Sequence, residues 1–252
     1  MTDFDDVDRA KQTVRQRVWD LLERSGAAPP GVHGHIPDFV GKEAAAARLA
    51  DTDAWKTAQV IKCNPDQAQL PVRVRALREG KLVYMAVPRL AAPKPFYLLD
   101  PHALEAPIDT AATSTGAAET APTVAPDEMQ PIDLIICGSI AIGRHDGVRI
   151  GKGAGYSDLE VALLVDAGLV TTDTTIATTI HQHQLIDDAL PHAAHDFPAN
   201  LAATPHELLD FGTRREPLPG IIEAHLRPDQ LHRIPALSRP VRRNAGPGGA
   251  CR

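Results

Sequence analysis

The stretch that most constrains the fold is an apolar run at residues 132–142, "IDLIICGSIAI", followed by a glycine-rich loop and a helical pattern. A nearly continuous apolar run is typical of a strand that is buried on both faces. After the loop, "SDLEVALLVDAG" predicts a helix that ends at Gly168. A buried strand, a glycine-rich loop and a helix in this order indicate an α/β fold.

The flanking sequence continues this alternation. Apolar residues at steps of three and four predict a helix over 5–24, and an Ala-rich segment predicts another over 42–55. Such alternation favours a sheet with helices on both faces. Further strands are predicted over 57–63, 81–88, 174–180 and 200–204, and further helices over 70–80 and from near Pro205.

We expect one α/β domain over residues 1–235. Residues 105–130 are rich in Ala, Thr and Pro and poor in bulky apolar groups, which predicts a mobile insertion without a chemical role. Residues 236–252, "ALSRPVRRNAGPGGACR", predict a disordered basic tail.

Composition narrows the functional classes. A net charge of −6 argues against a general nucleic-acid binder. No apolar run reaches the roughly 20 residues that a membrane-spanning helix needs, and the acidic start differs from a signal peptide. The three cysteines form no C-x-x-C pair, which disfavours a disulfide framework. A cytoplasmic protein without a membrane partner is expected, and its oligomeric state is left open.

The loop at 149–160, "RIGKGAGYSDLE", has the features of an anion site. Gly151, Gly153 and Gly155 let the backbone approach a ligand closely, and Arg149 and Lys152 add positive charge. The N–H groups of a helix N-terminus attract phosphate. A structural turn between strand and helix explains the same glycines, so both interpretations stay open.

The first turn of the helix carries an acidic residue that an anion site should disfavour. Ser157 and Glu160 form a capping-box pattern, which places the helix start at Ser157 and Asp158 close to the anion. A bridging Mg²⁺ would reconcile the carboxylate with a phosphate, because Mg²⁺ binds oxygens of both. The alternative is that Asp158 only complements the helix dipole.

Three motifs resemble the 5-formyltetrahydrofolate cyclo-ligase family, also called methenyltetrahydrofolate synthetase. The loop and its preceding strand match the family pattern R-[LI]-G-x-G-x-G-Y-x-D, and "KQTVR" at 11–15 matches its N-terminal K-x-x-x-R. A late "HD" supplies Asp196. The resemblance covers roughly residues 8–210 and is closest to the branch of methenyltetrahydrofolate synthase domain-containing proteins.

The resemblance implies a fold, a reaction and a set of site residues. The fold is a three-layer α/β sandwich with a mostly parallel central sheet, similar to ribose-phosphate isomerase and CoA-transferase domains. The reaction is the conversion of the small-molecule folate 5-formyltetrahydrofolate to 5,10-methenyltetrahydrofolate, with ATP and Mg²⁺. Asp158 and Asp196 are implied as Mg²⁺ ligands, and Lys152 and Tyr156 as the catalytic residues. The implied ATP-binding residues are Lys11, Arg15, Arg149, Ile150, Gly151, Lys152, Gly153, Ala154, Gly155, Tyr156 and Ser157.

Three departures from the family pattern keep alternatives open. Ser157 replaces a second aromatic residue, "KCNPDQAQLPVRV" (62–74) lacks the usual Glu after the first strand, and Asn200 stands where an acidic residue is common. A non-catalytic nucleotide- or folate-binding paralogue, acting as a sensor or interaction module, is therefore the second hypothesis. A sugar-phosphate isomerase on the same fold is the third.

Histidines offer one more candidate site. His181 and His183 on a strand would share one face and could bind a transition metal. A polar strand end explains them equally well, and His195 could orient Asp196. Cys137, at the end of a buried strand, is interpreted as an inert apolar residue.

Overall fold

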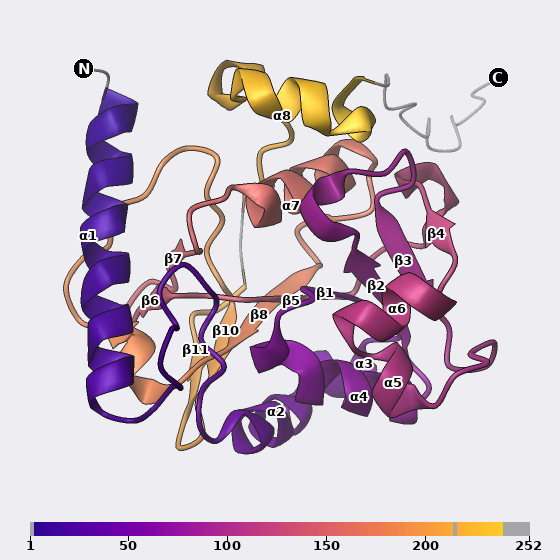
Figure 1. The fold of residues 1–252 in the computed structure, drawn as a ribbon, viewed down its shortest axis with the longest axis horizontal. Helices are drawn as coiled ribbons and strands as arrows, with labels where there is room; N and C mark the ends of the chain where they lie inside the picture. Colours follow the sequence, from indigo (N-terminus) through magenta and orange to yellow (C-terminus); the bar gives the residue numbers. More distant parts are fainter. Residues whose placement is uncertain (1–2, 214–215, 239–252) are drawn as a thin grey trace, which may run out of the picture.

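A computed structural model describes residues 3–213 and 216–238 (Figure 1). Its centre is an eight-stranded sheet in the order β11-β10-β8-β5-β1-β2-β3-β4. The five strands from β10 to β2 run parallel, and β3, β4 and β11 pair antiparallel at the two edges. The strands are β1 (Val60–Cys63), β2 (Leu82–Ala86), β3 (Phe96–Leu99), β4 (Thr123–Val124), β5 (Leu134–Cys137), β8 (Thr175–Thr179), β10 (Leu201–Ala203) and β11 (Leu208–Asp210).

Helices cover both faces of this sheet, which confirms the predicted α/β fold with a mostly parallel central sheet. In Figure 1, helices α2 to α6 lie below the sheet, and α7 and α8 lie above it. The protein therefore has three layers, with the sheet between two layers of helices. The helices are α1 (Asp3–Arg24), α2 (Lys42–Ala50), α3 (Asp53–Thr57), α4 (Leu70–Arg78), α5 (Ile108–Ala111), α6 (Ser114–Thr120), α7 (Tyr156–Asp166) and α8 (Pro228–Arg233).

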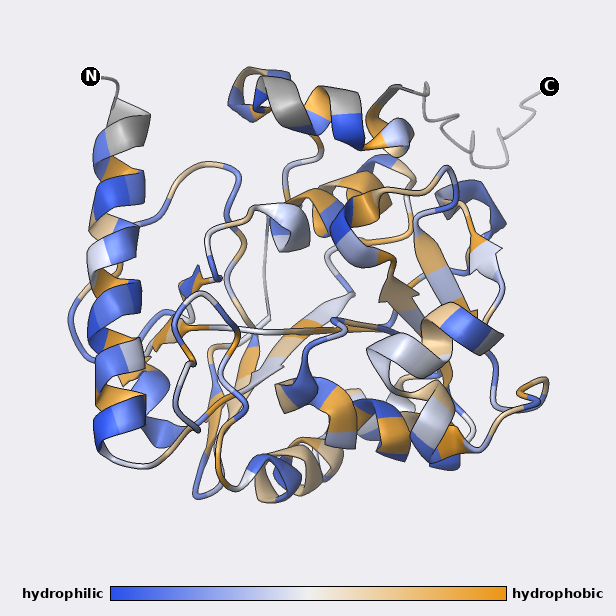
Figure 2. Ribbon diagram, viewed as in Figure 1, coloured by the Kyte–Doolittle hydropathy of each residue, from blue (hydrophilic) through white to orange (hydrophobic). Residues whose placement is uncertain are grey.

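The central strands send alternate side chains into two separate cores. Ile61 and Cys63 of β1 pack with α2 to α6, whereas Val60 packs with residues of α7. Since successive strand residues point to opposite faces, Lys62 lies on the α7 side with Val60. Figure 2 shows the consequence for α7, which is apolar over most of its length because the sheet and the C-terminal segment cover it.

A second, three-stranded sheet links the N-terminal helix to the glycine-rich loop. It consists of β6 (Ala141–Gly143), β7 (Arg149–Ile150) and β9 (Leu185–Ile186), in the order β7-β6-β9. The apolar stripe of α1, with Val18 and Leu22, packs against Ile140 and Ile150. This contact holds α1 beside the loop that follows β7.

The structure corrects the prediction of one continuous strand over 132–142. The segment forms β5 in the main sheet and β6 in the small one, with the break at Gly138 and Ser139. A Cβ at Gly138 would lie 2.9 Å from Asp66 Oδ2 and 3.0 Å from Ile36, so the chain needs glycine to pass between the two. Local periodicity carries no sign of this crossing.

Two helix predictions also change. The segment 42–55 forms two helices, because the Thr52 side chain accepts a hydrogen bond from Trp55 N and starts α3. The segment after Pro205 forms β11 instead of a helix. Thr204 explains this turn, since its Oγ1 accepts hydrogen bonds from His206 N and Glu207 N.

Residues 105–130 are the largest correction, because they are packed into the domain. They form α5, α6 and β4, and β4 pairs with β3 at the edge of the main sheet. Ala111, Ala112 and Ala117 are fully buried in the core. Small residues indicate an insertion by their composition, but in the structure they let two short helices pack closely against α4 and the sheet.

The predicted tail at 236–252 lies mostly outside the described residues. Within it, Ala236 is buried in the core beside α7. Among the described helices, none combines the length and apolar character needed to cross a bilayer.

Candidate functional site

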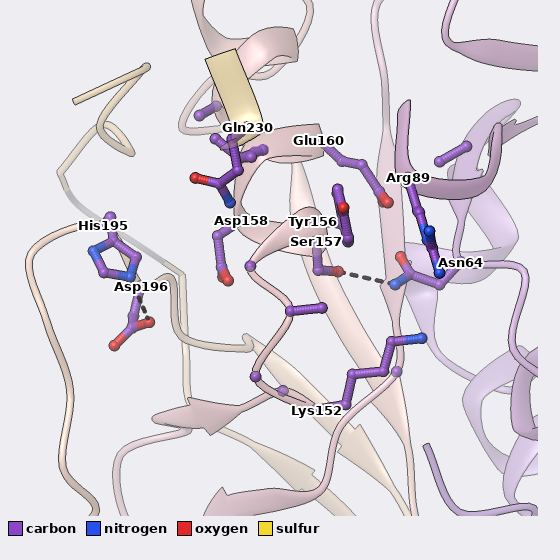
Figure 3. Close-up of a pocket in the computed structure, with 18 of the residues that line it drawn as sticks. Asn64, Arg89, Lys152, Tyr156, Ser157, Asp158, Glu160, His195, Asp196 and Gln230 are labelled. Atoms are coloured by element: carbon purple, nitrogen blue, oxygen red, sulfur yellow. Dashed lines mark hydrogen bonds and ion pairs between the residues drawn. The ribbon is translucent and has the colours of Figure 1, made fainter. Parts of the chain in front are cut away.

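One cavity of about 460 Å³ collects most of the residues singled out in the sequence. α1, the carboxyl end of β1, the glycine-rich loop, the first turns of α7 and the C-terminal segment 220–230 form its walls. In Figure 3, His195 and Asp196 lie on one side of the cavity and Asn64, Arg89 and Glu160 on the other. Predicted site residues on its wall are Lys11, Arg15, Arg149, Gly151, Lys152, Gly153, Ala154, Gly155, Tyr156, Ser157, Asp158 and Asp196.

Ile150 lies elsewhere. Its side chain is 1% exposed and packs in the core with α1. Its carbonyl oxygen accepts a hydrogen bond from Ile140 N at 2.7 Å. This residue therefore supports the loop and does not line the cavity.

The loop needs its glycines where the structure bends most. Gly153 and Gly155 adopt φ values of 96° and 72°, in the left-handed region that favours glycine. Arg15 Nε donates to Gly151 O at 2.8 Å, and a Cβ on Gly153 would lie 3.1 Å from the Arg15 guanidinium. Arg15 is thus buried against the loop backbone, and burial lowers its pKa from the ordinary arginine value.

Arg149 supplies the positive charge that compensates Asp158. Arg149 Nη2 donates to Asp158 Oδ1 at 2.8 Å, and its guanidinium stacks 4.4 Å above the Phe197 ring. Burial acts to lower the pKa of Arg149, but the carboxylates of Asp158 and Asp196 raise it above the ordinary value. A buried guanidinium therefore compensates Asp158 in this structure, and the role of Asp158 as a Mg²⁺ ligand stays a prediction.

The second predicted acid has its own cation. Lys11 Nζ lies 2.5 Å from Asp196 Oδ2, which also accepts a hydrogen bond from Ala193 N at 2.6 Å. The Lys11 and Asp196 side chains are 5% and 11% exposed. His195 Nε2 lies 3.6 Å from Asp196 Oδ1. Asp158 and Asp196 therefore share one cavity, each beside a buried cation.

The predicted capping box does not form. Helix α7 begins at Tyr156 after Gly155, without a side-chain cap. Ser157 Oγ instead accepts a hydrogen bond from Asn64 Nδ2 at 2.9 Å, and Glu160 Oε2 pairs with Lys62 Nζ. Both side chains thus bond to Lys62 of β1 and to Asn64, which follows it, and a local motif could not reveal these distant partners.

The side chains of the two residues implied as catalytic differ in exposure and packing. The Lys152 side chain is 43% exposed, and its ammonium lies 3.7 Å from Asp66 Oδ1. Tyr156, the first residue of α7, is half-buried and packs against the core on that side of the sheet. Both line the cavity.

Several cavity residues were missed in the sequence. Asn64 and Asp66 follow β1, and Arg89 lies in the Pro-Arg turn after β2 with a strained φ of 59°. A polar cluster directly after a buried strand was the available signal for the first two. Residues of the C-terminal segment carried no such signal; those on the wall are Gly220, Ile221, Ile222, His225, Leu226, Arg227 and Gln230.

The C-terminal segment lies directly over the loop. Arg227 Nη2 donates to Ala154 O at 3.1 Å, and a Cβ on Gly155 would lie 3.4 Å from Gln230 Nε2. His225 Nδ1 lies 3.0 Å from His195 Nδ1. The segment thus contacts the cavity at the loop and at the residue next to Asp196.

The other candidates have structural explanations. His181 caps a short 3-10 turn, where its Nδ1 accepts from His183 N. Within the described residues, no group of three or more His, Cys, Asp or Glu side chains could hold a metal ion. Asn200 Oδ1 accepts a hydrogen bond from Ile176 N and lies in a separate pocket. Cys137 is buried, which raises its pKa, in agreement with an inert role.

Comparison with known proteins places the chain in a family. The sequence model of the 5-formyltetrahydrofolate cyclo-ligase family matches residues 7–205. The solved structure of a 5,10-methenyltetrahydrofolate synthetase from Aquifex aeolicus shares the fold, with a TM-score of 0.52 and 18% identity over 85% of this chain and 97% of that one.

Curated relatives extend the match. The chain is 34% identical to the methenyltetrahydrofolate synthase domain-containing protein of Mus musculus over 90% of its own length and 62% of the relative. Its human counterpart is 30% identical over 90% of this chain and 60% of the relative. The chain therefore spans about three fifths of the length of these relatives. It belongs to the 5-formyltetrahydrofolate cyclo-ligase family.

Proposed function

We propose that this member of the 5-formyltetrahydrofolate cyclo-ligase family converts 5-formyltetrahydrofolate to 5,10-methenyltetrahydrofolate at the expense of ATP, with Mg²⁺. One observation carries the proposal. Lys11 and Arg15 from α1, Lys152 from the glycine-rich loop and Arg149 from β7 converge on one cavity. A triphosphate needs such a combination of cations and backbone N–H groups.

The chain's residues would bind the phosphates from two sides. Lys11 and Arg15 are buried, so their charges act in a medium of low dielectric and are weakly screened. Gly153 and Gly155 leave the loop backbone open to close approach. Lys152 is the cation with most freedom to follow a moving phosphoryl group, because its side chain is 43% exposed.

Asp158 and Asp196 fit a magnesium site by their chemistry. Both are carboxylates on the cavity wall, and Mg²⁺ in phosphoryl-transfer sites commonly uses one or two carboxylates together with phosphate oxygens. Arg149 contacts Oδ1 of Asp158 and Lys11 contacts Oδ2 of Asp196. A metal would therefore use Oδ2 of Asp158 and Oδ1 of Asp196, beside His195. When bound, Mg²⁺ would neutralise charge on the phosphates.

The reaction requires no nucleophile from the protein. The formyl oxygen attacks the terminal phosphorus of ATP, and the bond to ADP breaks. N10 of the folate then attacks the formyl carbon and loses its proton, and phosphate leaves with the former formyl oxygen. The protein holds both substrates in line and offsets the phosphate charge. Lys152 and Tyr156 are the residues assigned to contact the reacting groups.

A second candidate function is nucleotide or folate binding without turnover. It is favoured because Lys11 is paired with Asp196 and Arg149 with Asp158. Two of the cations assigned to the phosphates therefore already have a carboxylate partner. Ser157 also stands in place of an aromatic side chain, and its Oγ already accepts a hydrogen bond from Asn64.

An absorbance assay distinguishes the two. Purified protein with 5-formyltetrahydrofolate and MgATP should form the methenyl product and release ADP in equal amount. A protein that binds MgATP in calorimetry but forms no methenyl product and no ADP would establish the second candidate. Product formation without ATP would contradict both.

A further inference from the structure

A buried ion pair lies beneath the cavity, away from the cations assigned to ATP. Lys62 in β1 is fully buried and faces α7, where its Nζ contacts Glu160 Oε2 and donates to Asn64 Oδ1 at 2.7 Å. Both Asn64 and Glu160 line the cavity, although Lys62 does not. Lys62 therefore holds two cavity residues in place from below.

Stability alone explains this pair poorly. Moving two charges into the protein interior costs several kcal/mol per ion, and apolar pairs of similar volume are often as stable. Lys62 and Glu160 are surrounded by the apolar core between the sheet and α7, with Val60, Val161 and Leu164 close by in sequence. An aliphatic pair would suit such surroundings, so the charges call for another explanation.

Glu160 has an oxygen left for a ligand. Its Oε2 is taken by Lys62, and no residue that the structure describes donates a hydrogen bond to its Oε1. Oε1 is also open to solvent. It has no hydrogen-bond partner, yet it is not one of the fully buried, unpartnered oxygens of the described chain. The free oxygen is thus a fixed, negatively charged acceptor on the cavity wall.

Ser157 places a donor beside this acceptor. Asn64 Nδ2 donates to Ser157 Oγ at 2.9 Å, which leaves the hydroxyl hydrogen of Ser157 to point elsewhere. Ser157 and Glu160 are three residues apart on α7, so they are neighbours on one helix face. Figure 3 shows Asn64, Ser157 and Glu160 on the same side of the cavity. We call these three residues, with Lys62, the polar subsite.

We propose that the polar subsite binds the edge of a nitrogen heterocycle, with Glu160 accepting a hydrogen bond from a ring or exocyclic N–H and Ser157 donating to a neighbouring ring acceptor. The inference rests on the proposed function, whose two substrates both carry such an edge: the pterin of 5-formyltetrahydrofolate and the adenine of ATP. Lys62 is a positioning residue, and Glu160 and Ser157 are binding residues. Hydrogen bonds to a charged group are strong enough to decide ligand choice.

Three variants test the proposal. Glu160→Gln keeps the shape but removes the charge, although it leaves Lys62 unpaired. Lys62→Met with Glu160→Met removes both charges together and so preserves folding. Glu79→Gln is the matched control. Glu79 directly follows α4, on the other side of the sheet, and its Oε2 accepts a hydrogen bond from Trp55 Nε1 at 2.7 Å. Calorimetry measures the Kd of each variant for 5-formyltetrahydrofolate and for MgATP separately, and thermal melting checks the fold.

We expect the double variant to melt close to wild type and to lose about tenfold or more in affinity for one ligand, with little change for the other. Loss for 5-formyltetrahydrofolate assigns the subsite to the pterin, and loss for MgATP assigns it to adenine. Glu79→Gln should change neither Kd. A folded double variant that binds both ligands as the wild type does would overturn this inference alone. A wild type that binds neither ligand would overturn the proposed function and this inference with it.

Discussion

Asp158 and Glu160 are two carboxylates of one helix, two residues apart, and each faces a buried cation. The Asp158 side chain is 18% exposed beside the glycine-rich loop, whereas Glu160 is 7% exposed above β1. Their cation partners differ in the same way, since Arg149 lines the cavity and Lys62 does not. We expect the pair next to the open cavity to rearrange around a metal and phosphates, and the deeper pair to stay in place. One turn of α7 would then carry both proposed sites.

The largest effect on stability is expected for Arg149→Met. It removes the cation paired with Asp158 and the stacking on Phe197. We expect a loss of about 3 kcal/mol in the free energy of unfolding, measured with denaturant, and a loss of MgATP binding. Combining it with Asp158→Asn should recover part of the stability but no binding. A single variant as stable as the wild type would show that this pair contributes nothing.

Asp158→Asn should have the next largest effect. The Asn oxygen can still accept from Arg149, whose Nη1 also donates to Gly138 O, so the loss is smaller, about 1–2 kcal/mol. Affinity for ATP should fall in the presence of Mg²⁺ and change little without it. Asp173→Asn, exposed and away from this cavity, is the control. Equal ATP affinity with and without Mg²⁺ in the wild type would contradict a metal role for Asp158.

Arg227→Ala tests the cover that the C-terminal segment provides over the loop. Arg227 lies at the surface and donates to Ala154 O, so the expected loss of stability is below about 1 kcal/mol. Affinity for MgATP should fall a few-fold, as measured by calorimetry. Arg233→Ala, exposed on α8, should leave the affinity unchanged. Identical behaviour of both variants would mean that the cover takes no part in binding.

Lys152→Ala should have the smallest effect on stability, within about 0.5 kcal/mol, because the side chain is 43% exposed. The turnover rate should nevertheless fall at least about tenfold if Lys152 follows the transferred phosphoryl group. Lys152→Arg should recover part of the rate. Unchanged turnover in Lys152→Ala would remove this residue from the reaction.

Sequence reasoning succeeded where the signal was local. The glycines at 151, 153 and 155 define the loop, and the motifs around Lys11 and Asp196 led to residues that line the same cavity. It failed where contacts between segments far apart in the sequence determine the structure. Glu160 and Ser157 look like a helix cap, but their partners Lys62 and Asn64 lie 98 and 93 residues away.

Burial explains the remaining errors. Hydrophobic periodicity identifies β5 correctly but cannot show that the chain leaves the sheet at Gly138, since that depends on contacts with Asp66 and Ile36. Small residues such as Ala111 and Ala117 carry little hydropathy, although they pack fully in the core. The C-terminal segment reaches the cavity through single contacts, such as that of Arg227 with Ala154 O, which have no sequence pattern.

The proposed site is tested most directly by a crystal structure with Mg²⁺, a non-hydrolysable ATP analogue and 5-formyltetrahydrofolate. We expect phosphates against the loop at 151–155 and beside Lys11 and Arg15, with the metal between Asp158 and Asp196. A triphosphate bound outside this cavity, or a metal that touches neither carboxylate, would contradict it.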